Sequence, residues 1–161
     1  MSNRIENLVG CKCYGKCLDL GCGKDKHPTF ADGIDIQKFG QKYVSDIDNG
    51  KFPIEYEYYD TIHAWNVLEH IRNKVHVLNE CWRVLRKGGI MEAVMPDFAK
   101  KYELAIADPT HVSFWVQGTF TQYLCGTRGS NIGISKWDLI ECRNYDEVNE
   151  NLIIVKMRKP K

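Results

Sequence analysis

The sequence has no apolar run near the length of a transmembrane helix, and its charges almost cancel. A membrane-spanning helix needs roughly 20 predominantly apolar residues, and residues 1–9 lack the apolar core of a secretory signal peptide. The formal net charge is +1 at pH 7, so no overall positive charge favours nucleic acid or an anionic membrane surface. We therefore expect a cytoplasmic protein without membrane association and without a strong nucleic-acid signature.

The seven cysteines indicate neither a disulfide framework nor a metal site. An odd, scattered set is more typical of free thiols in a reducing compartment than of a secreted scaffold. Structural zinc sites favour cysteine pairs separated by roughly two to four residues, with further ligands beyond a loop. Cys11 and Cys13 are too close for that pattern, and Cys17 and Cys22 belong to an expected strand and glycine turn. No metal site is therefore expected.

Neither repeats nor low-complexity linkers divide the chain, so we expect a single domain over residues 1–161. Apolar residues recur at alternating steps of three and four from Leu68 to Leu85, which predicts a helix ending at Lys87-Gly88-Gly89. A short helix is expected near Thr119–Leu124. Short apolar segments predict strands at Cys17–Leu20, Gly33–Ile36, Tyr43–Ile47, Tyr59–Trp65, Ile90–Met95, Trp137–Cys142 and Leu152–Met157.

Strands that alternate with helices and loops in this order predict an α/β fold with a Rossmann-like, mainly parallel sheet and helices on both faces. The last strand follows the tight stretch 149–151, so a hairpin should make that strand antiparallel. Ligands in such sheets bind outside the carboxyl ends of the strands. The residues at those ends are therefore the first candidates for a functional site.

The first strand runs directly into the glycine turn Asp19-Leu20-Gly21-Cys22-Gly23. Glycine permits backbone geometry closed to other residues and lets a ligand approach the main chain. A dinucleotide fingerprint needs a third glycine and an acid about 20 residues downstream. Lys26 stands where that glycine would be, and Asp35 follows Gly21 after only 14 residues. The turn thus disfavours pyrophosphate binding and, with it, an NAD(P)-linked oxidoreductase.

Two further acids fall at strand ends. Asp35 ends the second strand, where a carboxylate can accept hydrogen bonds from both ribose hydroxyls. Asp46 follows the third strand, where it can accept from an adenine amino group. Each acid alone is equally typical of a turn. Together with the glycine turn, in the order of the strands, they favour a nucleoside-bearing ligand.

As a set, these motifs resemble the class I S-adenosylmethionine-dependent methyltransferases, in particular the compact members called methyltransferase type 11. The resemblance extends from Cys17 to Pro96 and less firmly to the end. It rests on Leu18–Gly23, Gly33–Ile36, Asp46 with Phe52-Pro53, Tyr59-Asp60, Asn66–Ile71 and Glu80–Gly89.

The resemblance implies S-adenosylmethionine as cofactor. The glycine turn would hold its methionyl part, Asp35 its ribose, Asp46 and Ile47 its adenine, and the end of the fourth strand would border the sulfonium and the acceptor. The implied cofactor-binding residues are Asp19, Gly21, Cys22, Gly23, Lys24, Asp35, Ile36, Asp46, Ile47, Trp65 and Asn66.

One departure from the family concerns the first helix. Only 11 residues separate Gly23 from Asp35, and Pro28 interrupts them, so this helix should be shortened or absent. The usual anchoring at a helix N-terminus would then be lost. Lys24 or Lys26 is expected to replace part of it by contacting the cofactor carboxylate.

The catalytic residues are harder to assign, because a base is needed only when the acceptor must lose a proton. His111 lies in the segment Asp108–Trp115, which resembles the segment over the active site of compact relatives, and it is the candidate base. Asp97 is a second candidate, whereas His70 is interpreted as structural or as a rim residue. The segment 64–67 lacks the Asn-Pro-Pro-Tyr pattern of base-amine methylation. The acceptor therefore stays open, as does the alternative of a non-catalytic, cofactor-binding regulatory module.

Overall fold

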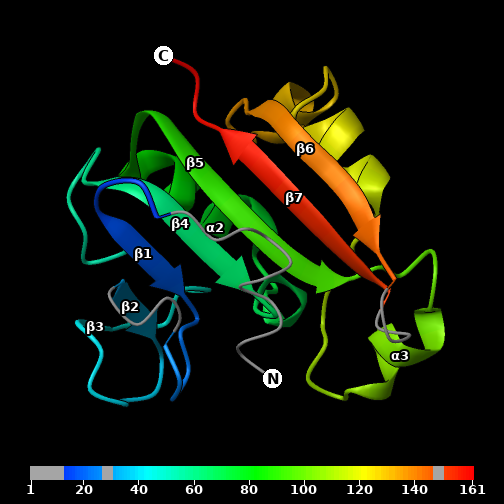
Figure 1. Cartoon of the computed structure of the whole chain (residues 1–161), viewed down its shortest axis with the longest axis horizontal. Coiled ribbons are helices and arrows are strands. Elements are labelled where there is room, and N and C mark those ends of the chain that lie inside the picture. The colour runs from blue at the N-terminus through cyan, green and yellow to red at the C-terminus, as the bar shows by residue number, and fades with distance from the viewer. Residues whose placement is uncertain (1–12, 27–30, 147–150) are drawn as a thin grey trace.

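The computed structural model describes residues 13–26, 31–146 and 151–161. Cys11, Pro28 and the expected hairpin residues 149–150 lie outside them. The strands form a seven-stranded sheet in the order β3-β2-β1-β4-β5-β7-β6 (Figure 1). They are β1 Cys17–Leu20, β2 Asp32–Asp35, β3 Tyr43–Val44, β4 Tyr59–Trp65, β5 Leu85–Pro96, β6 Asp138–Tyr145 and β7 Leu152–Arg158.

The pairing confirms a mainly parallel sheet with an antiparallel last strand. Strand β1 pairs in parallel with β2 and β4, and β4 pairs in parallel with β5. Strand β7 runs antiparallel between β5 and β6. The carboxyl ends of β1, β2 and β4 therefore meet at one edge of the sheet, where the candidate residues were expected.

The helices are few and short. Strands β1 and β4 have the predicted bounds, but the expected helix from Leu68 to Leu85 is broken into two. The remaining helical segments include two that were not predicted, α3 and η3. The described helical segments are η1 Leu68–His70, α2 Lys74–Val84, α3 Tyr102–Ala107, η2 Thr119–Leu124 and η3 Gly129–Ile132.

The helix breaks and ends for identifiable reasons. Asn73 caps α2, because its side chain accepts a hydrogen bond from the His76 amide. At the other end, Leu85 already pairs with Tyr59 as the start of β5. The prediction that the helix continues to Lys87-Gly88-Gly89 was therefore wrong, because pairing with β4 takes over the chain directly after Val84.

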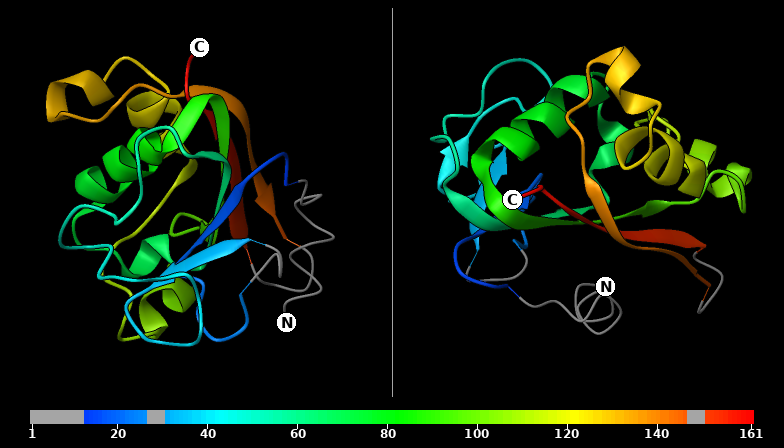
Figure 2. Two further views of the ribbon diagram at one scale, coloured as in Figure 1. Left: turned by 90° about the vertical axis from the view of Figure 1, so that its left-hand side faces the viewer. Right: turned by 90° about the horizontal axis from the view of Figure 1, so that it is seen from above.

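The main core lies between one face of the sheet and the helices. Leu18 and Ile62 of the central strands pack in the same cluster as Leu78 of α2 and Phe120 of η2. Figure 2 shows α2 and η2 on the same side of the sheet. The described parts of the β1–β2 and β2–β3 connections contain no helix that could cover the opposite face. Helices were expected on both faces of the sheet, and the described residues place them on one face.

The first helix is absent among the described residues between β1 and β2, as the short spacing from Gly23 to Asp35 predicts. Residues 21–26 form turns and bends instead. Within the parts of the chain that the structure describes, no helix has the length and apolar character needed to cross a bilayer.

Candidate functional site

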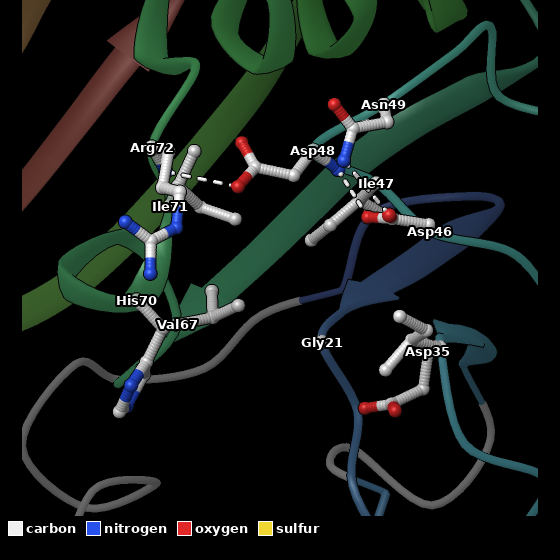
Figure 3. A pocket seen from close by; sticks show the side chains of 11 residues that line it. Gly21, Asp35, Asp46, Ile47, Asp48, Asn49, Val67, His70, Ile71 and Arg72 are labelled. Atoms are coloured by element: carbon white, nitrogen blue, oxygen red, sulfur yellow. Dashed lines mark hydrogen bonds between the residues drawn. The ribbon is translucent and has the colours of Figure 1, made fainter. Parts of the chain in front are cut away.

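A pocket of about 390 Å³ opens at the carboxyl ends of β1, β2 and β4 (Figure 3). This volume lies within the range of small-molecule sites. The structure brings together five of the predicted cofactor residues: Gly21, Asp35, Ile36, Asp46 and Ile47. The other lining residues are Asp48, Asn49, Val67, His70, Ile71 and Arg72.

The glycine turn is held close to two strands. The amides of Gly21 and Cys22 both donate to the Ile34 carbonyl of β2, at 2.9 and 3.2 Å. Gly21 has a φ of +62°, and a Cβ at this position would lie 2.2 Å from Cγ2 of Val67. Only glycine fits this position without movement of its neighbours. The turn can therefore present its main chain to a ligand at the end of β4.

Asp35 braces the same turn in place of a helix. One carboxylate oxygen accepts the Gly23 amide at 2.9 Å, and the other accepts the Gln37 amide at 2.9 Å. Each oxygen keeps a second lone pair, so the carboxylate can also accept a ribose hydroxyl. Gly23 has a φ of +56°, and no atom lies within 4 Å of the position of its missing Cβ. Open space for a ligand thus borders the braced turn.

Asp46 holds the turn that follows β3. Its two oxygens accept the Asp48 amide and the side-chain amide of Asn49, each at 2.9 Å (Figure 3). The hydrogen bond from Asn49, followed by that from Asp48, holds the pKa of Asp46 below its usual value. The carboxylate is therefore ionised at neutral pH and keeps Ile47 in the pocket wall.

Asp48 is a pocket residue that the sequence did not reveal. Its carboxylate accepts the backbone amides of Arg72 at 3.0 Å and Asn73 at 2.7 Å. These bonds join the loop after β3 to the start of α2 and close one side of the pocket (Figure 3). The sequence shows only a turn-forming Asp-Asn-Gly stretch, because the partners are more than 20 residues away.

His70 lines the opposite wall of the pocket, as a rim residue. Its Nδ1 lies 3.2 Å from the Thr110 carbonyl oxygen and 3.0 Å from the Thr110 hydroxyl. A carbonyl oxygen only accepts, so Nδ1 carries the proton in this arrangement and Nε2 has a lone pair. A neutral His70 can therefore act as a proton acceptor beside the pocket.

His111 stands behind His70 without lining the pocket. Its Nδ1 donates to the Ala105 carbonyl at 2.7 Å, which again leaves the lone pair on Nε2. The two imidazole rings meet edge to face with their centroids 4.8 Å apart. The predicted base is thus in contact with a pocket residue rather than with the pocket itself.

Glu69 adds a buried carboxyl group beside the two partly exposed imidazoles. Only 3% of Glu69 is exposed, and ligand atoms of Glu69, His70 and His111 lie within 4.8 Å of one another. Burial raises the pKa of Glu69 to about 7, against a smaller opposing effect of His111. The Glu69 carbonyl also accepts the amides of Val112 and Ser113, both at 2.9 Å, which ties the segment that carries His111 to η1.

The remaining predicted residues do not line this pocket. Asp97 is 2% exposed, and its carboxylate accepts the Ala99 amide and the Asn144 side chain, so it shapes the loop after β5. Lys26 donates to the Ala31 carbonyl, whereas Lys24 is exposed at the glycine turn. The other predicted cofactor residues outside the lining are Asp19, Cys22, Gly23, Trp65 and Asn66.

The neighbouring predicted residues shape the site from behind. Asp19 is buried at the carboxyl end of β1 beside His63 of β4. Asn66 has a φ of +49°, and its amide donates to the Val94 carbonyl at 2.8 Å, so the chain turns sharply after β4. Burial, followed by the charges of Asp19 and Asp35, raises the pKa of Cys22 to about 11, so this thiol stays neutral.

Comparisons with known proteins agree with this arrangement. A family model described as a methyltransferase domain matches residues 3–127. No curated protein matches the sequence. An S-adenosylmethionine-dependent methyltransferase from Thermotoga maritima is 12% identical, with a TM-score of 0.69 over 96% of this chain and 87% of the other. One from Archaeoglobus fulgidus is 15% identical, with a TM-score of 0.66 over 98% and 90%.

The same fold also includes a protein described as a cyclase. The cyclase SpnF is 11% identical, with a TM-score of 0.64 over 99% of this chain and 79% of the other. Likeness at such low identity shows the fold alone. The family model, however, matches most of the chain and includes the glycine turn and every pocket-lining residue. The chain therefore belongs to the methyltransferase domain family, and it has the fold of S-adenosylmethionine-dependent methyltransferases.

Proposed function

We propose that the chain binds S-adenosylmethionine in this pocket and transfers a methyl group to an acceptor that binds on the side of His70. The observation that supports this most directly is the joint placement of Gly21, Asp35, Asp46 and Ile47 in one cavity, with His70 on its far wall. The acceptor is a small molecule, a glycan or a macromolecular side chain, and the pocket itself favours none of these.

The residues present fit the parts of the cofactor. The glycine turn offers a main chain with open space beside Gly23. Asp35 is fixed by two backbone amides and has lone pairs left for ribose hydroxyls. Ile47 supplies an apolar surface for an adenine ring, and Asp46 beside it is an ionised acceptor. Lys24 is the exposed cation nearest in sequence to the glycine turn and would pair with the cofactor carboxylate.

When bound, the cofactor supplies a methyl group on a positively charged sulfur, which is a good leaving group. The chain mainly has to hold the acceptor in line with that methyl carbon and exclude competing geometries. This positioning can lower the activation barrier by several kcal/mol. His70 lines the pocket, so an acceptor bound on that side would contact its imidazole ring. The Asp48 hydrogen bonds hold the loop after β3 at a fixed distance from the start of α2, and so fix this wall of the pocket.

The histidine pair provides a route for a proton. His70 can accept a proton at Nε2 from an acceptor hydroxyl or amine, because its Nδ1 proton is held by Thr110. The His111 ring contacts His70, and a Glu69 carboxylate oxygen lies within 4.8 Å of a ring nitrogen of each. An acid with a pKa near 7 can share that proton at neutral pH.

Turnover distinguishes an enzyme from the alternative, a non-catalytic cofactor-binding module. The purified protein is incubated with S-adenosylmethionine and a panel of hydroxyl, amine and thiol acceptors, and S-adenosylhomocysteine is quantified by mass spectrometry. We expect acceptor-dependent product that is lost in Asp35→Ala. Cofactor binding without product on any acceptor would favour the regulatory module. Structural likeness to a cyclase makes this test necessary, because the fold is not confined to methyl transfer.

A further inference from the structure

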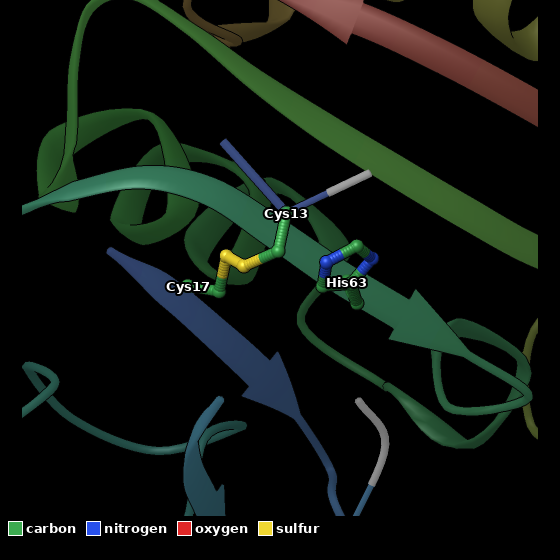
Figure 4. A group of neighbouring side chains, drawn as sticks. All are labelled: Cys13, Cys17 and His63. Carbon is green, nitrogen blue, oxygen red and sulfur yellow. A yellow bond between two sulfur atoms is a disulfide. The ribbon is translucent and has the colours of Figure 1, made fainter. Parts of the chain in front are cut away.

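Two cysteines and a histidine meet on the face of the sheet opposite α2. Cys17 is the first residue of β1, and His63 lies in the neighbouring strand β4. Side chains alternate along a strand, and Leu18 and Ile62 point into the main core, so Cys17 and His63 share the other face. The sulfurs of Cys13 and Cys17 and a ring nitrogen of His63 lie within 4.8 Å of one another, with the imidazole beside the two sulfurs (Figure 4).

We propose that the reduced protein binds one Zn²⁺ ion through the sulfurs of Cys13 and Cys17 and an imidazole nitrogen of His63. Thiolate and imidazole are the ligands that zinc prefers. Three residues separate the cysteines, a spacing within the usual range for one arm of a zinc site. The structure shows the two sulfurs joined as a disulfide. The same two atoms ligate the metal when the pair is reduced.

The chain holds the cysteine arm in place without the metal. Gly15 has a φ of +73°, and a Cβ there would lie 2.2 Å from the Asp60 carboxylate. That carboxylate accepts the Lys16 amide at 2.8 Å, and the Thr61 hydroxyl donates to the Tyr14 carbonyl at 3.2 Å. The tight turn between the two cysteines is therefore fixed to β4, the strand that carries His63.

A carboxylate lies behind the histidine. Nδ1 of His63 is 3.4 Å from Oε2 of Glu92, an ion-pair distance outside hydrogen-bond geometry, and Nζ of Lys156 is 3.2 Å from the other Glu92 oxygen. Histidines that ligate zinc commonly have a carboxylate at the second ring nitrogen, which orients the ring. His63 is fully buried and Glu92 is 4% exposed, so the orientation is protected from solvent. Glu92 is thus a positioning residue for the proposed site.

The position of the site indicates a structural role. A bound ion would join the start of β1 and the turn before it to β4, and β1 leads into the glycine turn, which no described helix braces. The fourth position of a tetrahedral ion falls to water. The inference does not depend on the proposed methyl transfer, because its test measures metal binding.

Zinc binding is measured on the full chain kept reduced with a phosphine, by competition with a chromophoric chelator. We expect one equivalent per chain, and a thermal midpoint that rises with zinc concentration. Cys13→Ser, Cys17→Ser and His63→Gln should each weaken binding by roughly 100-fold or more, and Glu92→Gln by about 10-fold. Cys142→Ser is the matched control, and it should bind like the wild type. Equal binding by the wild type and the Cys13→Ser/Cys17→Ser variant would overturn the site.

A measurement on the wild type covers the case in which a variant fails to fold. Zinc should protect Cys13 and Cys17 from alkylation, as mapped by peptide mass spectrometry, while Cys142 reacts as before. Cobalt in place of zinc should give the thiolate charge-transfer absorption of a tetrahedral sulfur site. If the reduced protein shows neither protection of these cysteines nor the cobalt absorption, the reduced pair does not bind metal and the proposal is wrong.

Discussion

The imidazole rings of His70 and His111 meet edge to face, with centroids 4.8 Å apart, across the boundary of the pocket. His70 comes from η1 and His111 from a segment more than 40 residues later, and each ring donates its Nδ1 proton to a carbonyl in residues 105–110. The Nε2 lone pair of His70 is thereby directed away from those carbonyls, and Nε2 of His111 lies 3.9 Å from the Asp108 carboxylate. This arrangement gives the proposed active site a defined proton acceptor and a neighbour to stabilise it.

Removal of either imidazole should reduce turnover, and removal of His111 should do so without loss of cofactor binding. We expect His70→Ala and His111→Ala each to lower kcat by on the order of 100-fold for an acceptor that must lose a proton. Calorimetry should show S-adenosylmethionine affinity within about threefold of wild type in His111→Ala, since His111 does not line the pocket. His76→Ala on α2 is the control. Unchanged kcat in both variants would mean that the histidines only order the loop.

Glu69 should make stability fall as the pH rises. Its folded pKa of about 7 lies above its usual value of 4.5, so the folded state binds more protons than the unfolded state between these values. Unfolding free energy therefore decreases as the pH rises through this window. Relative to Glu69→Gln, the wild type should lose on the order of 2–3 kcal/mol between pH 5 and pH 8.

Urea denaturation at a series of pH values measures this difference. The exposed Glu103, in the first turn of α3, provides the control, because Glu103→Gln should leave the pH dependence unchanged. Parallel stability curves for the wild type and Glu69→Gln would show that Glu69 is ionised in the folded protein at pH 7.

Gly21→Ala should damage both stability and cofactor binding. The alanine would have to adopt a left-handed φ, and its methyl group would lie 2.2 Å from Cγ2 of Val67. We expect a loss of about 2 kcal/mol or more in unfolding free energy. Val67→Ala removes the closest atom, so the double variant should recover part of that loss in a thermal melt. Additive losses would show that the contact with Val67 is unimportant.

Much of the fold follows from local sequence, and most of what does not depends on distant contacts. Strands β1 and β4 were predicted with their observed bounds, because each is a short apolar run that ends at a polar turn. Strand β3 was predicted too long, since only Tyr43–Val44 pairs with β2. The early end of α2 reflects pairing of Leu85 with Tyr59, which no helical periodicity can reveal.

The pocket residues likewise fall into those that local sequence predicts and those that depend on distant contacts. Gly21, Asp35 and Asp46 were found because strand ends and turn residues are visible locally. Asp48 was missed as a wall residue because its role depends on the amides of Arg72 and Asn73. The zinc inference has the same origin, since the cysteine pair gains its third ligand only when β1 pairs with β4.

Lys24 should contribute more to cofactor affinity than Lys26. Lys24 is exposed beside the glycine turn, whereas the Lys26 ammonium already donates to the Ala31 carbonyl. We expect Lys24→Ala to weaken S-adenosylmethionine binding by roughly 3- to 10-fold, because an exposed ion pair contributes on the order of 1 kcal/mol. Raising the salt concentration should reduce the difference in S-adenosylmethionine affinity between Lys24→Ala and the wild type, because salt screens the ion pair. Equal affinities in low salt would remove Lys24 from the site.

The most direct test of the account is calorimetric titration of the wild type and Asp35→Ala with S-adenosylmethionine, S-adenosylhomocysteine and NAD. Asp35 fixes the glycine turn and faces the pocket, so its removal should weaken binding of both adenosyl ligands by at least about 10-fold. Asp25→Ala, an exposed change in the same connection, should bind as the wild type does. We predict saturable binding of one S-adenosylmethionine per chain and none of NAD. Preference for NAD, or adenosyl binding that is indifferent to Asp35, would contradict the proposed function.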